Sequence, residues 1–191
     1  MKIWLNGSFV SASGAIDAGD RGLLLGDGVF ETLAVLDGRP LRFARHLARL
    51  ADGAALLGME LPATAGEIGA AIRALCESAE IVEGSARITL TRGPASRGVL
   101  PPPVPTPTLL VTAARGAVGD TAPLAAIVAG STRRNDFSPL AAVKSTNYLD
   151  AIIARREADD VGAGEAIMLN TRDRVAEATA ANVFCVIGGE L

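Results

Sequence analysis

The chain has 191 residues, enough for one large or two small domains with a sizeable hydrophobic core. Hydrophobic residues make up 49% of the sequence and charged residues 20%, an ordinary globular composition that argues against a disordered chain. The net charge of −3 provides no basic field for nucleic acid or an anionic membrane surface, so we expect neither partner.

The sequence also bears on compartment and on metals. No apolar run is long enough to span a bilayer, and the first residues lack the pattern of a secretory signal. Cys76 and Cys185 fall in a predicted helix and a predicted strand, and we interpret both as reduced core residues of a cytoplasmic protein. His46 is the single histidine, so no zinc or iron site is expected.

The first forty residues predict two hairpins with a loop between them. Residues 3–10 alternate around the Asn6-Gly7 turn, and residues 29–36 form a strand that closes at Asp37-Gly38. The glycine-punctuated residues 17–28 predict a loop between these hairpins.

Gly26 and Gly28 in that loop invite comparison with a dinucleotide-binding fingerprint. The third glycine of the fingerprint is missing, and a strand follows where a helix is required. We therefore reject a dinucleotide site.

Two amphipathic helices are predicted next. Residues 41–58 form the first, with Gly58 as its stop and an inner face of Leu47, Leu50, Ala54 and Leu57. A capping box of Thr64 and Glu67 opens the second. Its inner face consists of Ile68, Ile72, Leu75 and Cys76.

The middle of the chain predicts a domain boundary. Strands at 87–91 and 108–113 flank the proline-rich residues 101–107, which cannot be helix or central strand. Residues 114–123 are rich in glycine and alanine without periodicity, so we place a linker at 115–122. This gives an N-terminal domain of residues 1–114 and a second domain of residues 123–191.

The second domain predicts a strand, a helix and three further strands. The strands are 124–129, 165–170, 175–178 and 182–187, and the helix is 147–159 with Leu149, Ile152 and Ile153 on its inner face. Arg133, Arg134, Asp159 and Asp160 are interpreted as solvated charges. The sequence stops just after a hairpin turn, so we expect it to be an incomplete piece of a longer protein.

Lys144 stands between a proline-bearing loop and the start of a helix, in a position that suggests chemistry. An unprotonated lysine amine attacks a carbonyl to form an imine. If the carbonyl belongs to pyridoxal phosphate, the site also needs a cation for the phosphate and a carboxylate for the ring nitrogen. Arg49 and Glu177, the latter interrupting an apolar strand pair, are candidates for these roles. The alternative for Lys144 and Arg49 is a solvated surface charge, and the alternative for Glu177 is a carboxylate at a strand edge.

Five segments then occur in an order that resembles one family. They are Gly26–Thr32 (GDGVFET), His46-x-x-Arg49-Leu50, Thr91-Arg92-Gly93 with Arg97-Gly98, Lys144–Tyr148 (KSTNY) and Glu177–Asn182 (EATAAN). The order resembles the class IV aminotransferases, which are the fold type IV pyridoxal-phosphate enzymes. This family includes branched-chain aminotransferases, D-amino-acid aminotransferases and aminodeoxychorismate lyases. The resemblance covers nearly the whole chain.

The resemblance implies a role for each candidate residue. Lys144 would be the Schiff-base lysine, Glu177 the partner of the pyridine nitrogen, Arg49 a phosphate ligand and Tyr148 a donor near the phenolic oxygen. Phe30 and Arg97 would bind substrate, although Phe30 fits a core position equally well. In D-amino-acid enzymes the loop of Arg97 reaches the neighbouring subunit's site, which implies a homodimer.

The implied fold is α+β with two domains. A small α/β N-terminal domain is joined by a short linker to a larger, β-barrel-like domain, which would be truncated here. The part beyond residue 191 would supply further phosphate contacts.

Three functions stay open. The first is a pyridoxal-phosphate-dependent aminotransferase that moves an amino group between an amino acid, of D or branched-chain type, and a 2-oxo acid. The second is an aminodeoxychorismate lyase that releases pyruvate and 4-aminobenzoate, and the third is a non-catalytic cofactor-binding fragment.

Local sequence separates these functions only in part. The spacing from Lys144 to Asn147-Tyr148 favours the D-amino-acid and lyase groups over the branched-chain group. Val99 stands where D-amino-acid enzymes usually carry histidine and where lyases often carry tyrosine. We prefer aminotransferase as the broader description.

Overall fold

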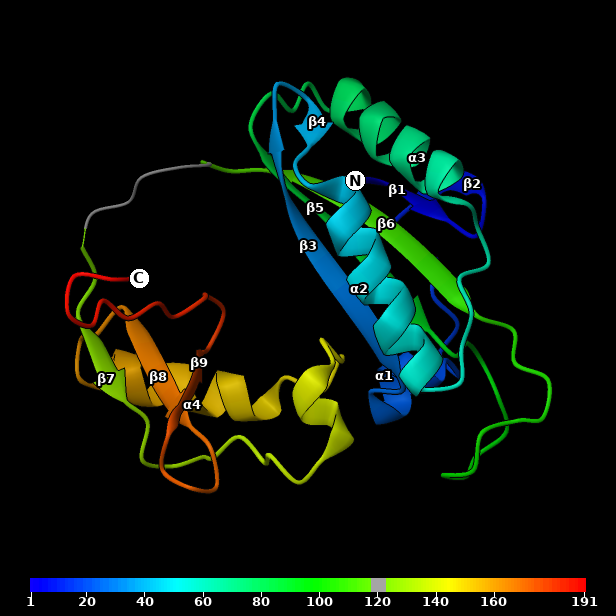
Figure 1. Ribbon diagram of the computed structural model, residues 1–191. Helices are drawn as coiled ribbons and strands as arrows, with labels where there is room; N and C mark the ends of the chain where they lie inside the picture. Colours follow the sequence, from blue (N-terminus) through cyan, green and yellow to red (C-terminus); the bar gives the residue numbers. More distant parts are fainter. Residues whose placement is uncertain (118–122) are drawn as a thin grey trace. The chain divides into compact units, whose positions relative to one another are not determined.

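The computed structural model describes residues 1–117 and 123–191 (Figure 1). The chain divides into two compact units, one of Met1–Gly119 with Val143–Thr146 and one of Asp120–Ala142 with Asn147–Leu191. Residues 118–122 of the predicted linker 115–122 lie outside the described residues.

The first unit is built on a six-stranded antiparallel sheet with the order β2-β1-β6-β5-β3-β4. Its strands are β1 (Lys2–Leu5), β2 (Ser8–Ser11), β3 (Gly28–Leu36), β4 (Arg39–Pro40), β5 (Gly84–Thr91) and β6 (Thr108–Arg115). Both predicted hairpins are confirmed. Asn6 and Gly7, and likewise Asp37 and Gly38, have positive φ, as two-residue hairpin turns require.

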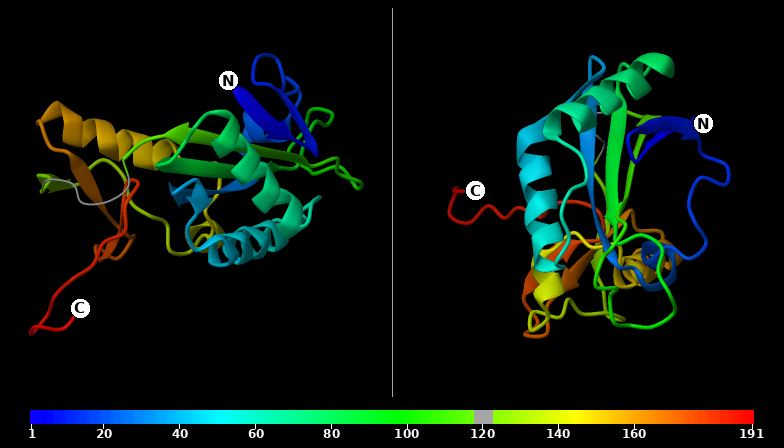
Figure 2. Two further views of the ribbon diagram at one scale, coloured as in Figure 1. Left: turned by 90° about the horizontal axis from the view of Figure 1, so that it is seen from above. Right: turned by 90° about the vertical axis from the view of Figure 1, so that its right-hand side faces the viewer.

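Helices α2 (Phe43–Leu56) and α3 (Ala65–Ser78) cover one face of this sheet (Figure 2). The predicted capping box of α3 is confirmed, because Thr64 and Glu67 each accept a hydrogen bond from the other's backbone N–H. Gly58 follows α2 with a φ of 66°, the left-handed conformation of a helix stop.

Residues 17–28, predicted to be a loop throughout, contain the short helix α1 (Arg21–Leu25). The carboxylate of Asp20 caps it by accepting a hydrogen bond from the Gly22 N–H at 2.7 Å. The helix ends at Gly26, whose φ is 68°. Local capping therefore allows one helical turn inside a glycine-rich segment.

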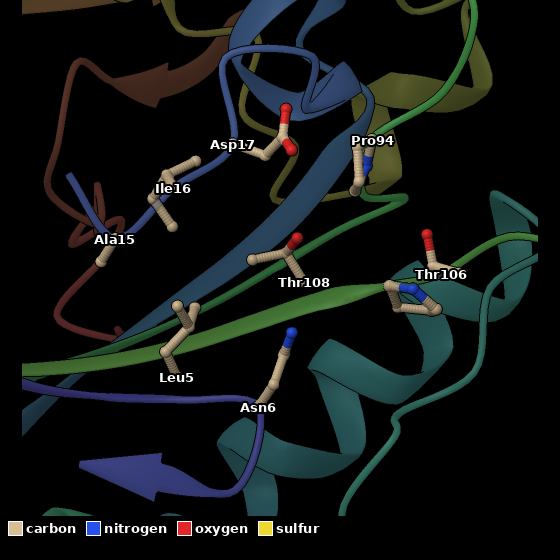
Figure 3. A pocket seen from close by; sticks show the side chains of 9 residues that line it. Leu5, Asn6, Ala15, Ile16, Asp17, Pro94, Thr106 and Thr108 are labelled. Atoms are coloured by element: carbon tan, nitrogen blue, oxygen red, sulfur yellow. The ribbon is translucent and has the colours of Figure 1, made fainter. Parts of the chain in front are cut away.

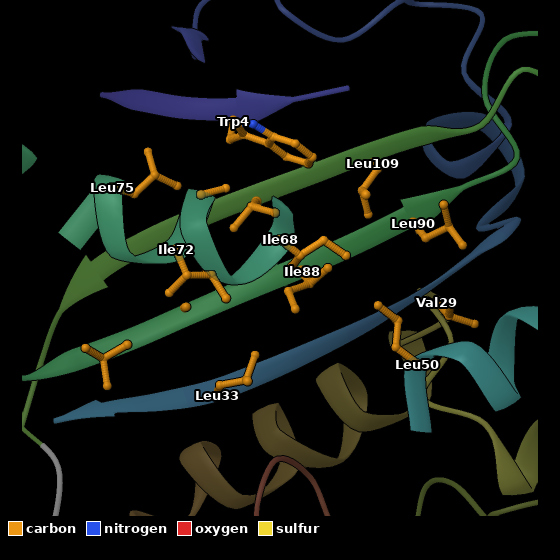
Figure 4. Packing of buried hydrophobic residues seen from close by; sticks show 14 of the residues in the cluster. Trp4, Val29, Leu33, Leu50, Ile68, Ile72, Leu75, Ile88, Leu90 and Leu109 are labelled. Atoms are coloured by element: carbon orange, nitrogen blue, oxygen red, sulfur yellow. The ribbon is translucent and has the colours of Figure 1, made fainter. Parts of the chain in front are cut away.

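Strand alternation divides the sheet of the first unit into two faces. Val29, Leu33 and Val35 of β3 point toward the helices, and the first two pair in register with core residues of β5. Figure 4 shows the side chains of α3 packed against this face, where the cluster includes Trp4, Leu50, Ile68, Ile72, Leu75, Cys76, Ile88, Leu90, Leu109 and Val111. Cys76 is buried as predicted, and this burial raises the pKa of its thiol.

The second unit has a three-stranded sheet with the order β7-β8-β9. Its elements are β7 (Ala126–Val128), a 3₁₀ turn (Pro139–Ala142), α4 (Leu149–Asp160), β8 (Glu165–Leu169) and β9 (Val175–Ala178). β7 and β8 are parallel and are connected through α4, whereas β8 and β9 form an antiparallel hairpin. None of the helices that the structure describes is long and apolar enough to cross a membrane.

The buried face of α4 differs from the predicted one. Leu149, Ile152 and Ile153 are exposed, and Ala154 and Ala158 are buried instead. The two alanines belong to a cluster with Ala129, Ala163, Ala166 and Met168. Small side chains let the helix lie close to β8, so the prediction of Leu149, Ile152 and Ile153 as the inner face is wrong.

The predicted strand 182–187 is also wrong. Among the described residues these positions pair with no strand, and only an isolated bridge joins Ile187 to Glu190. Cys185 is consequently exposed rather than a core residue. Side-chain alternation is present in this segment, but a strand exists only where its backbone finds a hydrogen-bonding partner.

Candidate functional site

Lys144 lies in a short segment that extends the edge of β3. The backbone N–H of Phe30 donates to the Lys144 carbonyl at 2.9 Å, and the Thr146 N–H donates to the Gly28 carbonyl at 2.9 Å. The Thr146 hydroxyl also donates to the Gly26 carbonyl at 2.7 Å. These bonds place Val143–Thr146 in the first unit, apart from the rest of the predicted domain 123–191.

The side chain of Lys144 lies against the aromatic ring of Phe30, on which Arg87 also stacks. Its Nζ lies 4.8 Å from the centre of the Phe30 ring, and the Arg87 guanidinium carbon lies 3.5 Å from the same centre. Phe30 alternates with the core residues of β3, so its ring lies on the sheet face away from α2 and α3. It is buried beneath the two cationic side chains, which explains why its sequence fitted both a core and a pocket position.

Sequence reasoning did not single out Arg87. Its position on β5 is opposite Thr32, in a register that only the β3·β5 pairing reveals. The available signal was the alternation of β5, which predicts that Arg87 and Thr89 share the outward face.

The helix-facing side of β3 carries a charge cluster. Glu31 has no exposed side-chain surface and accepts hydrogen bonds from Arg49 Nε at 2.5 Å and from an Arg49 terminal nitrogen at 2.6 Å. His46 Nδ1 lies 2.7 Å from the same carboxylate. Both partners come from α2, one helical turn apart, and the Arg49 side chain is 56% exposed. Glu31 was also missed, although a carboxylate in the core-facing alternation of a strand is a visible signal.

Arg97 is exposed on the loop that connects β5 to β6. Arg21 holds this loop by donating to the Gly98 and Val99 carbonyls, each at 2.8 Å.

Glu177 lies on β9 in the second unit, where it forms an ion pair with Arg134 at 2.9 Å. The carboxylate side chain is 43% exposed and that of Arg134 only 26%, so Arg134 is a pairing residue and not the solvated charge we predicted. Arg133 likewise pairs with Asp173 at 3.1 Å. Within its own unit, Glu177 therefore has Arg134 as its positive partner.

The turn after Glu177 is fixed by a second carboxylate. Glu165 accepts hydrogen bonds from the Thr179 hydroxyl and from the Ala166 N–H. Burial raises the pKa of Glu165, but these hydrogen bonds outweigh it and hold the pKa below its usual value. Tyr148 is half-buried at the N-terminus of α4 in the same unit.

The structure thus brings some predicted site residues together. Lys144 and Phe30 are in contact on one face of the first unit, and Arg49 joins Glu31 from the other face. Arg97 lies on a loop of the same unit, whereas Tyr148 and Glu177 belong to the second unit. The described residues contain no group of histidine, cysteine and acidic side chains that could hold a metal ion.

A separate open pocket of about 300 Å³ lies beside the first hairpin turn (Figure 3). Its lining residues are Leu5, Asn6, Ala15, Ile16, Asp17, Pro94, Thr106, Pro107 and Thr108. The oxygens of Asn6 and Asp17 already accept backbone hydrogen bonds from Leu109 and Gly19. None of the predicted site residues lines it.

Comparison with known proteins assigns the chain to a family. The model of the amino-transferase class IV family matches residues 28–191. The chain therefore belongs to the class IV aminotransferases, a family of pyridoxal-phosphate-dependent transaminases and lyases, and the resemblance drawn from the five motifs is confirmed.

The similar sequences have several assigned activities. A Methanocaldococcus jannaschii protein assigned by name to the branched-chain-amino-acid aminotransferases is 34% identical, over 100% of this chain and 67% of its own length. A D-alanine aminotransferase of Staphylococcus epidermidis is 28% identical, over 98% of this chain and 67% of its own.

Solved structures confirm the fold. The branched-chain aminotransferase of Thermoproteus uzoniensis with norvaline has a TM-score of 0.88 at 27% identity, over 99% of this chain and 66% of that one. The 4-amino-4-deoxychorismate lyase of Pseudomonas aeruginosa has a TM-score of 0.79 at 32% identity, over 98% and 68%. The chain thus has the fold type IV architecture and spans about two thirds of the length of these relatives.

The donor set of the chain fits pyridoxal phosphate. A half-buried lysine is fixed by backbone hydrogen bonds on a strand edge, and a partly exposed arginine, Arg49, has its guanidinium oriented by Glu31. Glu177 is a carboxylate that already pairs with a cation. These are the groups that the aldehyde, the phosphate and the ring nitrogen of the cofactor require.

Proposed function

We propose that this protein is a pyridoxal-phosphate-dependent aminotransferase that moves an amino group between an amino acid and a 2-oxo acid. The position of Lys144 supports the proposal most strongly: its backbone is fixed to β3, and its Nζ lies against the Phe30 ring, on which the Arg87 guanidinium also stacks. Bound pyridoxal phosphate would supply the electron sink for the carbon that loses its proton.

Each of the predicted site residues would have its own role in that chemistry. Lys144 would bind the cofactor covalently and then, once its amine is released, carry the proton from the substrate carbon. Glu177 would hold the ring nitrogen protonated, because a carboxylate next to a pyridinium nitrogen stabilises the positive charge of that nitrogen. Arg49 would bind the phosphate and Tyr148 would donate near the phenolic oxygen.

We also propose that cations on the first unit bind the substrate carboxylate. Arg87 lies on the same sheet face as Lys144 and has an exposed guanidinium that stacks on Phe30. An arginine fork binds a carboxylate through two parallel hydrogen bonds, which lysine cannot reproduce. Arg97 on the β5–β6 loop is a second such cation, and Phe30 forms the wall between substrate and sheet.

A second candidate function is the lyase reaction on aminodeoxychorismate. The 32% identity to the Pseudomonas aeruginosa lyase favours it, and the same lysine and carboxylate would serve both reactions. The two functions are distinguished by their products, since the lyase releases pyruvate and 4-aminobenzoate together and needs no 2-oxo acid acceptor.

The covalent role of Lys144 can be tested against Lys2, the other lysine of these 191 residues, as a control. The full-length protein is loaded with pyridoxal phosphate, reduced with borohydride and mapped by peptide mass spectrometry. We expect the cofactor mass on the Lys144 peptide and an imine absorption band in wild type and Lys2→Arg, with both signals lost in Lys144→Ala. A band that persists in Lys144→Ala contradicts the proposal.

The substrate is tested on the same preparation. D-alanine, branched-chain L-amino acids and aminodeoxychorismate are assayed separately, with and without a 2-oxo acid. We expect Arg87→Met to raise KM for the amino acid about 10- to 100-fold, as loss of a charge-assisted bidentate contact does. Pyruvate and 4-aminobenzoate formed without an acceptor would replace the aminotransferase with the lyase.

We further propose a cytoplasmic homodimer. Cys76 and Cys185 form no disulfide in the part of the chain that the structure describes, which supports a reducing compartment. Leu23, Leu24 and Leu25 of α1 are all exposed, and such a run of apolar side chains is typical of a surface that a partner covers.

A further inference from the structure

A buried charge network lies beside the loop that carries Arg97. Asp27 accepts hydrogen bonds through one carboxylate oxygen from Arg21 Nε and from Arg92 Nε, each at 2.8 Å. The arginine side chains are only 5% and 7% exposed and that of Asp27 is 13% exposed. Two cations are therefore buried around one anion, an arrangement that needs further acceptors to be stable.

Backbone carbonyls supply those acceptors, and their positions are informative. Arg92 donates to the Leu57 carbonyl at 2.6 Å, at the C-terminal end of α2. Arg21 donates through its two terminal nitrogens to the Gly98 and Val99 carbonyls, each at 2.8 Å. The network thus joins the end of α2 to the residues directly after Arg97.

Without Arg21, few contacts would fix this part of the loop. Arg97, Gly98, Val99 and Leu100 are all exposed, and Gly98 has a φ of 141° that an L-residue rarely adopts. The Arg21 guanidinium uses all three of its nitrogens at once, on one carboxylate and two carbonyls. A planar fork with five N–H donors can do this, whereas a lysine ammonium cannot match the geometry.

We infer that Arg21 is a positioning residue: by holding the Gly98–Val99 backbone it sets the place of Arg97, and through Arg97 it sets the affinity of the site for the substrate carboxylate. Asp27 and Arg92 hold Arg21 in turn. The link to substrate rests on the proposed role of Arg97, whereas the link to the loop rests only on the hydrogen bonds described above.

The two links are tested separately on the full-length protein. The first measurement is limited proteolysis with trypsin, which cuts the exposed Arg97–Gly98 bond. We expect Arg21→Lys, which retains the charge and the trypsin site at residue 21, to speed this cleavage about tenfold. Arg73→Lys, which changes an exposed arginine on α3, should cut at the wild-type rate. An unchanged rate in Arg21→Lys overturns the inference, whatever the activity of the protein.

The second measurement is steady-state kinetics with pyridoxal phosphate saturating. We expect Arg21→Lys to raise KM for the amino acid tenfold or more while kcat stays within about threefold and the imine band is unchanged. A merely structural role would lower kcat and cofactor occupancy as well. A loosened loop with a wild-type KM would overturn the link to substrate affinity.

A variant on the loop itself covers the possibility that Arg21→Lys fails to fold. Gly98→Ala leaves the side chains of Arg21, Asp27 and Arg92 unchanged, and an added Cβ has nothing within 4 Å, but the new residue is strained at a φ of 141°, so the loop backbone has to shift. It should raise KM as Arg21→Lys does, while a single cooperative unfolding transition shows that the variant is folded. If wild type has no activity toward amino acids while cleavage still responds to Arg21→Lys, the proposed function fails and the positioning of the loop stands.

Discussion

Glu31 is a buried carboxylate whose partners, Arg49 and His46, both come from α2. Replacing it with glutamine keeps the shape but removes the charge and turns an amide N–H toward donors. Because Arg49 can still be hydrated through its exposed part, we expect Glu31→Gln to lower the free energy of unfolding by about 1–3 kcal/mol.

Urea unfolding followed by the fluorescence of Trp4 measures this loss. Trp4 is the single tryptophan of these 191 residues and is buried in the first unit, so its fluorescence reports on that unit. Glu77→Gln, at an exposed position of α3, is the matched control and should stay within about 0.5 kcal/mol of wild type. If Glu31→Gln unfolds like this control, the pairing does not stabilise the first unit.

The pKa of Asp27 predicts the direction in which the free energy of unfolding changes with pH. Burial raises its pKa, but hydrogen bonds from Arg92 and Arg21 outweigh burial and lower the pKa below the ordinary value of 3.8. A lowered folded-state pKa contributes stability that is complete above the unfolded pKa and is lost as the pH falls through the folded pKa.

The test compares wild type with Asp27→Asn by urea unfolding at several pH values. We expect wild type to be more stable by on the order of 1–3 kcal/mol at neutral pH, with the same difference down to about pH 5. Below about pH 4 the difference should shrink, because the wild-type carboxylate becomes protonated. A difference that grows toward acid pH would contradict the assigned charge state.

At the scale of structural elements, the turn after β5 depends on one glycine. Gly93 has a φ of 83°, and a Cβ at this position would lie 1.7 Å from the Thr106 carbonyl oxygen. Its own carbonyl accepts a hydrogen bond from the Arg21 N–H at 3.0 Å. The backbone of α1 and the strand pair β5–β6 therefore meet at a point where no side chain fits.

Gly93→Ala should consequently destabilise the first unit by about 2–4 kcal/mol, since backbone and not a flexible side chain would have to move. Gly116→Ala is the control, because its added Cβ meets nothing within 4 Å. Thermal unfolding monitored at Trp4 compares the two variants, and equal midpoints would show that the turn can relax around a methyl group.

Elements whose signals are local were predictable from the sequence. The Asn6-Gly7 turn and the Thr64–Glu67 capping box depend on residues within one turn of each other, and the structure has both. The buried face of α4 was not predictable, because Ala154 and Ala158 are selected by β8, an element outside the helix. The prediction of a strand at residues 182–187 fails for the same reason, because alternation of side chains does not supply a neighbouring strand to pair with.

The residues of the candidate site likewise differ in how far the sequence predicts them. Lys144 stood out because its neighbours form a contiguous motif. Glu31 and Arg87 acquire their meaning from strand register and from the packing of α2, which join residues far apart in the sequence. A contiguous motif can be recognised in a sequence more readily than contacts that depend on strand register and helix packing.

At the scale of the whole molecule, exposed apolar residues of the first unit predict self-association. Arg21, the first residue of α1, donates a hydrogen bond to the Val99 carbonyl of the β5–β6 loop. Val99 and Leu100 of that loop are exposed, as the α1 leucines are. In a two-fold symmetric dimer the same surface is used twice, so each substitution removes two contacts. Burying one leucine side chain contributes about 1.5–3 kcal/mol.

Light scattering coupled to size-exclusion chromatography on the full-length protein should therefore give twice the chain mass for wild type. Leu24→Asp should raise the dimer dissociation constant at least 100-fold and yield monomer at micromolar concentration, because two buried leucines are replaced by two charges. Val161→Asp, at an exposed position in the second unit, should remain dimeric. A wild-type protein that is monomeric at these concentrations rules out the homodimer, and a dimeric Leu24→Asp moves its interface away from α1.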